Sequence, residues 1–115
     1  MQIISMSLDG IPLLEIRDDI DHAAAEEFHA TARTALDGRH RLVLDLSGCR
    51  YVDSGGLAVI LSLTKEIGPE GLLALVGGNR NLVRLFHLVG LDAEPRVRLY
   101  TDLAAVELPA AVDDR

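Results

Sequence analysis

One segment of the chain carries most of the information about its fold: Leu42-Val-Leu-Asp-Leu-Ser-Gly-Cys-Arg-Tyr-Val-Asp-Ser-Gly-Gly-Leu57. The leucines at every second position near its start share one face of a strand, which is predicted over Arg41 to Leu46. A polar loop follows, and a helix is predicted from Ser54 to about Ile67. A strand, a loop and a helix in this order are typical of an α/β protein.

The stretch of this helix from Leu57 to Leu63 is apolar almost all round. This pattern predicts a largely buried helix, with Leu61 in the core. The turn Gly68-Pro-Glu-Gly71 ends the helix, and Leu72 to Val76 forms a continuous apolar run. Such a run is expected of a central strand in a parallel sheet that is covered on both faces.

The N-terminal part of the chain predicts a hairpin. Gln2 to Leu8 and Ile11 to Arg17 are apolar-rich, and Asp9-Gly10 between them favours a type I′ turn. A helix is then predicted from its cap, Asp21, to a point just before Gly38, because apolar residues recur at helical spacing. The first two strands are therefore antiparallel and lead into a helix.

The C-terminal part continues the alternation of helices and strands. A third helix is expected with Asn81 as its cap and Gly90 at its end. Arg96 to Tyr100 alternates between polar and apolar residues, as in a strand with one solvated face. A last helix is predicted from Thr101 to near Leu108.

The whole pattern predicts an α/β fold with a mixed β-sheet, in which an N-terminal antiparallel pair precedes alternating helices and strands. We expect residues 1–108 to form a single domain. Residues 109–115, from Pro109 onward, are expected to form a flexible C-terminal tail.

Composition excludes several classes of function. The chain has 115 residues, a net charge of -7 and a single lysine, Lys65, whereas nucleic-acid binding needs clustered basic residues. A basic protein partner fits this charge better. Cys49 is the one cysteine and cannot form an internal disulfide, and the N-terminus lacks the features of a signal peptide. The longest apolar run, Leu57 to Leu61, is far shorter than the roughly 20 residues that cross a bilayer. We therefore expect a cytoplasmic protein without membrane insertion.

Ser54 is the residue best placed for chemistry, because it stands at or beside the predicted N-terminal cap of a helix. A phosphate there would meet free backbone N–H groups and the positive end of the helix dipole. Gly55 and Gly56 leave the backbone uncovered, so that a kinase could approach the hydroxyl. Serine is also a common helix cap, and the spacing alone favours a purely structural role.

Three ordered motifs resemble the STAS domain family. The strand and Asp53-Ser-Gly-Gly-Leu57 are similar to the family's apolar strand followed by Asp-Ser-(Ser/Thr)-Gly-Leu at a helix start. Ile20-Asp-His22 resembles its Gly-x-(Leu/Ile)-Asp element. Asn81-Leu-Val-Arg-Leu-Phe86, with Val89-Gly-Leu91 after it, resembles its Val-x-Arg-Leu-Phe segment and Gly-Leu stop.

The resemblance implies an anti-sigma factor antagonist, also called an anti-anti-sigma factor. In such members the serine after the aspartate is phosphorylated by an anti-sigma factor serine kinase, a histidine-kinase-like ATPase. That serine corresponds to Ser54, and the implied partner-binding residues are Asp21, His22, Asp53, Ser54, Gly55 and Gly56. The unphosphorylated form would hold the kinase and free a sigma factor, and phosphorylation would break the complex. Neither a catalytic residue nor a cofactor nor a metal is implied, so the chain is expected not to be an enzyme.

Two positions depart from the family pattern. Gly55 stands where Ser, Thr or Ala is usual, and Asp18 stands where a glycine is expected. Neither removes the acceptor serine, but together they leave open a divergent member with a different kinase or without phosphorylation. The chief alternative function is a STAS subunit of a transporter or lipid-trafficking assembly, which packs against an ATPase without being phosphorylated.

The remaining candidates favour structural roles. Gly77-Gly-Asn79 is expected to be a strand-to-helix turn, since no phosphate-binding loop motif is present. His22 and His29 lie on one helical face without further ligands at metal spacing, and a solvated face is expected. Asp45 suits a capping or hydrogen-bonding role as well as a functional one. Cys49 is expected to be a small buried hydrophobe.

Overall fold

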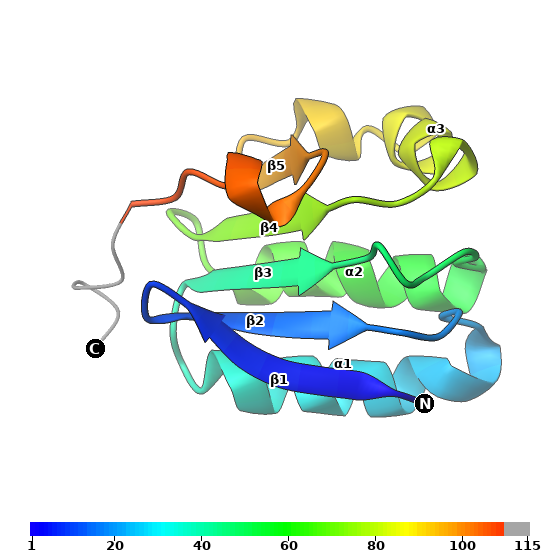
Figure 1. Cartoon of the computed structure of the whole chain (residues 1–115), viewed down its shortest axis with the longest axis horizontal. Coiled ribbons are helices and arrows are strands. Elements are labelled where there is room, and N and C mark those ends of the chain that lie inside the picture. Colours follow the sequence, from blue (N-terminus) through cyan, green and yellow to red (C-terminus); the bar gives the residue numbers. More distant parts are fainter. Residues whose placement is uncertain (110–115) are drawn as a thin grey trace.

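The computed structural model describes residues 1–109. One five-stranded sheet has the order β1-β2-β3-β4-β5 (Figure 1). β1 and β2 are antiparallel, and every later neighbour is parallel. The predicted α/β fold with its N-terminal antiparallel pair is confirmed. The strands are β1 (Ile3–Leu8), β2 (Ile11–Ile16), β3 (Arg41–Asp45), β4 (Leu72–Val76) and β5 (Val97–Tyr100).

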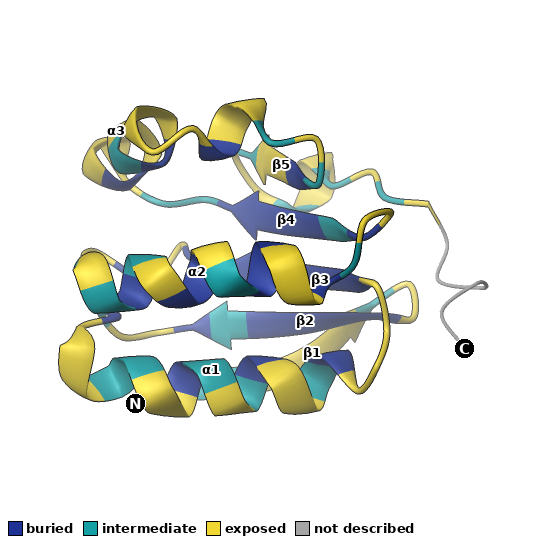
Figure 2. Cartoon of the chain, turned by 180° about the vertical axis from the view of Figure 1, so that it is seen from behind, coloured by how far each residue is buried: buried dark blue, intermediate teal, exposed yellow. Residues whose placement is uncertain are grey.

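The helices cover one face of this sheet. Figures 1 and 2 agree that α1 and α2 lie side by side on the same face, while α3 lies toward the β5 edge. Two short 3-10 helices, η1 and η2, flank β5 in the sequence. The helices are α1 (His22–Leu36), α2 (Ser54–Glu66), α3 (Arg80–Leu88), η1 (Leu91–Ala93) and η2 (Leu103–Ala105).

The β1–β2 hairpin turns through Asp9 and Gly10, which have φ angles of 52° and 82°. Positive φ at both central residues is the requirement of a type I′ turn, whose twist matches that of the flanking strands. The pairing register sets Leu8 opposite Ile11 and Ile3 opposite Ile16. The predicted hairpin is thus confirmed.

The main core lies between the sheet and the helices. The leucines of β3 and its extension, at positions 42, 44 and 46, are fully buried there, whereas Val43 faces the other side. On α2 the buried positions follow helical spacing: Gly56, Val59, Ile60, Leu63 and Thr64.

Leu61, which was predicted to be in the core, is 37% exposed. The prediction of the helix was correct, but that of its buried face was wrong. A run that is apolar all round does not indicate which side meets the sheet. The sheet contacts the stripe that contains Ile60 and Leu63, and Leu61 lies beside it.

The cap of α3 is Asn79 and not Asn81, which corrects the prediction. The side-chain oxygen of Asn79 accepts a hydrogen bond from the Leu82 N–H at 2.9 Å, and its amide nitrogen donates to the Arg50 carbonyl at 2.9 Å. Both asparagines are good caps by residue type. The bond to Arg50, from a distant loop, favours Asn79.

The predicted helix from Thr101 to Leu108 is also wrong, because only the single turn η2 forms there. The chain beyond it packs against the sheet face that α1 and α2 leave open, and the Tyr100 hydroxyl donates to the Glu107 carbonyl at 3.1 Å. Pro109 disfavours helical geometry at the residue before it. The predicted tail lies outside the described residues except for Pro109.

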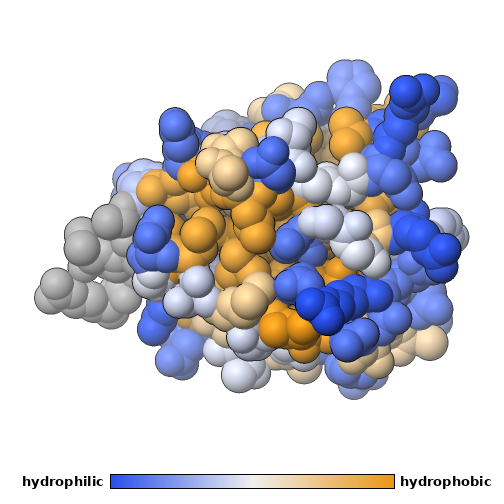
Figure 3. All heavy atoms as spheres, in the orientation of Figure 1, coloured by the Kyte–Doolittle hydropathy of each residue, from blue (hydrophilic) through white to orange (hydrophobic). Residues whose placement is uncertain are grey.

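This second face carries its own apolar cluster. Five residues are buried there, and η2 and the segment after it pack against them: Ile11, Leu13, Val43, Ala74 and Val76. Figure 3 shows apolar side chains gathered over this face of the sheet. We call these five residues the front cluster.

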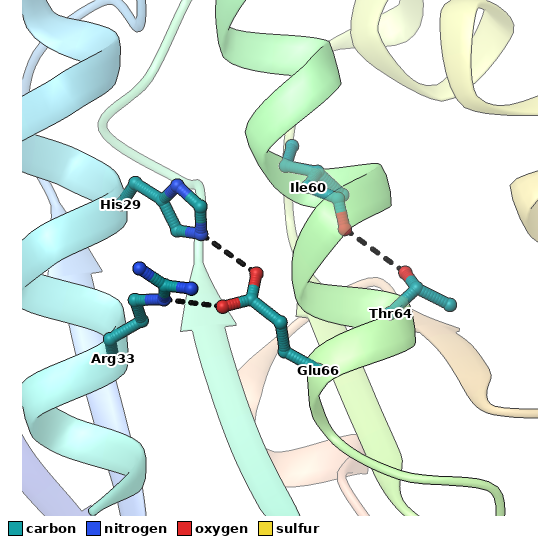
Figure 4. A network of polar contacts seen from close by, with 5 residues as sticks. All are labelled: His29, Arg33, Ile60, Thr64 and Glu66. Atoms are coloured by element: carbon teal, nitrogen blue, oxygen red, sulfur yellow. Dashed lines mark hydrogen bonds and ion pairs between the residues drawn. The ribbon is translucent and has the colours of Figure 1, made fainter.

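A polar network joins the two main helices (Figure 4). His29 of α1 contacts the Glu66 carboxylate at 2.7 Å, and Arg33 donates to the other oxygen of that carboxylate. Burial alone would raise the pKa of Glu66, but the hydrogen bonds from His29 and Arg33 outweigh it and lower this pKa. His29, expected on a purely solvated face, therefore ties α1 to α2.

Candidate functional site

Two loops meet where β2 and β3 end. Ile20 and Val52 form an isolated parallel bridge. The Ile20 N–H donates to the Tyr51 carbonyl at 2.9 Å, and the Asp53 N–H donates to the Ile20 carbonyl at 3.1 Å. These bonds hold the start of α1 beside the start of α2, although the two starts are far apart in the sequence.

Asp53 holds both helix starts. One carboxylate oxygen accepts from the Gly56 N–H at 3.0 Å, which caps α2, and the other accepts from the His22 N–H at 2.7 Å. The Gly56 bond is the largest cause of the lowered pKa of Asp53, and the His22 bond acts in the same direction. Asp53 therefore stays ionised at neutral pH and links α2 to α1.

Ser54 is the first helical residue of α2 and is exposed. Its hydroxyl makes no hydrogen bond to any residue from 1 to 109. Because Asp53 caps the helix, the purely structural role considered for Ser54 does not hold. The hydroxyl points to no internal partner and is available for chemistry at the positive end of the helix.

The two glycines after Ser54 allow the start of α2 to lie close to Ile20 and His22. A Cβ on Gly56 would lie 2.5 Å from the Ile20 carbonyl oxygen, so no side chain fits there. A Cβ on Gly55 would lie 3.2 Å from Nδ1 of His22 and 3.3 Å from an Asp53 oxygen. A side chain at position 55 would therefore crowd His22 and Asp53, which would have to shift by a few tenths of an ångström.

Asp21 caps α1 by accepting from the Ala24 N–H at 2.9 Å. All six partner-binding residues expected from the sequence thus lie in one patch at this end of the molecule. We call this the Ser54 patch, and its members are Asp21, His22, Asp53, Ser54, Gly55 and Gly56.

The loop between β2 and α1 adds Asp19, which the sequence did not single out, and Asp18, which it marked only as a departure from the family pattern. Asp19 accepts from the Arg50 N–H at 3.2 Å, and Asp18 accepts from the Gln2 N–H. Asp18 therefore ties the loop to the start of β1. Both residues, with Asp21 and Glu27, line an open hollow of about 420 Å³. Partners from such distant parts of the sequence leave no local pattern by which to find them.

The other sequence candidates have structural roles. Cys49 is buried, and burial raises the pKa of its thiol. Asp45 accepts from the Ser47 N–H at 3.0 Å and from the Ser47 hydroxyl. Gly77 and Gly78 form the turn before α3. Within residues 1–109 no group of three or more His, Cys, Asp or Glu could hold a metal ion, and no helix is long and apolar enough to cross a membrane.

Comparison with known proteins agrees with this geometry. A family model described as "Mlab, STAS domain" matches residues 6–103. The chain belongs to the STAS domain family. Among curated relatives of this STAS domain, anti-sigma-F factor antagonist RsfB of Mycobacterium tuberculosis is 32% identical over 87 residues, which are 73% of this chain and 70% of the relative. Putative anti-sigma factor antagonist BtrV of Bordetella bronchiseptica is 28% identical over 92 residues, which are 78% of this chain and 79% of the relative.

Solved structures give the same result. An anti-sigma factor antagonist from Mycobacterium paratuberculosis superposes with a TM-score of 0.80 at 25% identity, covering 90% of this STAS domain and 87% of that chain. SpoIIAA in its unphosphorylated form shares the fold, with a TM-score of 0.63 at 18% identity, covering 76% of this chain and 83% of that chain. These relatives are named for antagonism of a regulatory factor, in line with the prediction that the chain is not an enzyme.

Proposed function

We propose that this STAS domain is an anti-sigma factor antagonist which binds an anti-sigma factor kinase through the Ser54 patch and is released when the kinase phosphorylates Ser54. The names of its relatives in Mycobacterium and Bordetella support the first part. The geometry of α2 supports the second.

The single observation that carries the proposal is the division of tasks between Asp53 and Ser54. Asp53 caps α2, whereas the Ser54 hydroxyl is exposed at the first helical position. Phosphorylation can therefore occur without removing a bond that holds the fold. The missing Cβ atoms of Gly55 and Gly56 face His22 and Ile20, so the start of α2 packs closely while the Ser54 hydroxyl stays exposed.

A phosphate on Ser54 would change the charge of the patch. It adds about -1.5 to -2 charge, next to the ionised Asp53 and near Asp21. A partner surface that fits the neutral Ser54 hydroxyl would have to accommodate the bulk of the phosphate and to strip water from its charge. This is a physical route by which modification would weaken the complex.

The test is incubation with its cognate anti-sigma factor kinase and ATP, followed by mass spectrometry of the intact chain and of its peptides. We expect one phosphate, on Ser54, and none on the Ser54→Ala variant. Phosphate on Thr31, Thr34, Thr64 or Thr101 alone would refute the assignment. A stable complex with an ATPase that never transfers phosphate would favour the alternative, a non-phosphorylated STAS subunit of a transporter or lipid-trafficking assembly.

A further inference from the structure

β1 is an edge strand without the usual protection. It has six residues, Ile3-Ile-Ser-Met-Ser-Leu8, and none of them is charged or a proline. Exposed edges offer unpaired backbone groups to other chains, and proteins commonly blunt them with charges, prolines or short strands. β1 has none of these features.

The opposite edge strand, β5, is shorter and carries a charge. β5 has four residues, among them the exposed Arg98, and lies between two 3-10 helices in the sequence. A short strand with a charged side chain is a poor template for pairing. The contrast singles out β1 as the edge that is open to a partner strand.

The backbone groups that β1 turns outward can be assigned. The Arg17 N–H donates to the Gln2 carbonyl at 3.0 Å, so Gln2 faces β2. In an antiparallel pair the bonding groups alternate along the strand. Ile4, Met6 and Leu8 therefore bond to β2, and the outward groups belong to Ile3, Ser5 and Ser7. Within residues 1–109 no hydrogen bond reaches these outward groups.

We propose that two copies of this chain pair through β1, antiparallel, about a two-fold axis at Ser5. In this register Ser5 lies opposite Ser5 of the other copy, and Ile3 lies opposite its Ser7. All three outward residues then bond in both copies. Shifting the register by two residues either way leaves an outward residue of each strand unpaired or sets it opposite the hairpin turn, so this register is the self-complementary one.

The side chains fit the same register. Opposite residues share a face of the joined sheet, so Ile4 of one copy lies against Met6 of the other, twice by symmetry. Met6 is 43% exposed in the single chain. It lies opposite Leu13, a member of the front cluster, and therefore on the same face of the sheet. Pairing covers Met6 and joins the two sheets into one, with a continuous apolar front.

Sedimentation equilibrium on three forms tests the pairing: the wild type, Ser5→Ala and Ser5→Pro. Alanine keeps the outward N–H, and we expect a dimer like that of the wild type. Proline removes this donor without touching the bonds to β2, and the dissociation constant should rise at least about tenfold. A monomeric wild type over about a hundredfold range of concentration, or an undiminished Ser5→Pro dimer, overturns the proposal.

Cross-linking gives a second readout that does not depend on the folding of the proline variant. Ser5→Cys sets two thiols opposite each other and should form a covalent dimer on mild oxidation. Ser7→Cys is the matched control, since the two Ser7 positions are about 13 Å apart along the strands. The wild type controls for Cys49. Equal cross-linking at positions 5 and 7 refutes the register. The proposed function does not depend on this pairing, so either can fail alone.

Discussion

At the scale of residues, the site depends on two neighbours with different tasks. Asp53 accepts hydrogen bonds from Gly56 and His22, and thereby joins the starts of α2 and α1. Ser54 makes no such bond within the described chain and is exposed. A structural residue and a modifiable residue thus stand side by side at one helix start.

This division predicts opposite consequences for stability. Ser54→Ala should change the free energy of unfolding by no more than about 0.5 kcal/mol. Asp53→Asn keeps one acceptor oxygen but loses the second, and it should lower the melting temperature at neutral pH. Thermal melts of the two variants check this, and a larger loss for Ser54→Ala would show that the serine is the cap.

The pH dependence follows from the lowered pKa of Asp53. Its contribution is fully present above the ordinary value of 3.8 and is lost as the pH falls through the lower value of the folded state. The difference in melting temperature between wild type and Asp53→Asn should therefore be constant near neutral pH and shrink in strong acid.

At the scale of elements, α2 buries some of its apolar side chains and exposes others of the same type. Leu61 and Leu63 are both leucines in the same apolar run, yet Leu63 is fully buried and Leu61 is 37% exposed. The same helix starts at the Ser54 patch and ends at Glu66, which contacts His29 and Arg33 of α1.

The pair forms a matched test of the helix's orientation. Leu63→Ala removes atoms from the closed core and should cost about 2 to 5 kcal/mol, because a cavity remains. Leu61→Ala should cost about 1 kcal/mol or less. Denaturant unfolding of both variants measures this. Equal costs would mean that α2 is rotated relative to the described packing.

At the scale of the whole molecule, charge is unevenly distributed. The net charge is -7, and the loop before α1 brings Asp18, Asp19 and Asp21 next to the Ser54 patch. α3 instead presents the exposed Arg80 and Arg84. A partner is therefore expected to place basic groups opposite the aspartates and none opposite the neutral Ser54.

This distribution predicts how a charge at Ser54 acts. Ser54→Asp adds a carboxylate that suits the helix dipole, so it should fold like the wild type. It should nevertheless bind the partner kinase more weakly than Ser54→Ala, because its carboxylate loses water on binding and meets no matching basic group. The gap should persist as salt shortens the screening length from ~10 Å at 0.1 M to ~3 Å at 1 M. Affinity titrations at both salt concentrations measure this. Equal affinities at low salt would contradict an electrostatic switch.

Local patterns were sufficient for much of the fold and of the site. Alternation predicted β3, helical spacing predicted α1 and α2, and Asp9-Gly10 predicted the hairpin, because each depends on residues that are neighbours in the chain. The resemblance to the STAS family predicted the six residues of the Ser54 patch as partner-binding residues.

Other features depend on contacts between distant segments. Asn79 caps α3 instead of Asn81 because it also bonds to Arg50, and the chain after Thr101 stays mostly extended because it packs across the front cluster. Leu61 is exposed because the sheet meets another stripe of α2. Asp53 reaches His22 only because Ile20 and Val52 pair. Asn79 and Asn81 are the same residue type, as are Leu61 and Leu63, so local propensity cannot distinguish them. The tertiary contacts distinguish them, and no local pattern encodes those contacts.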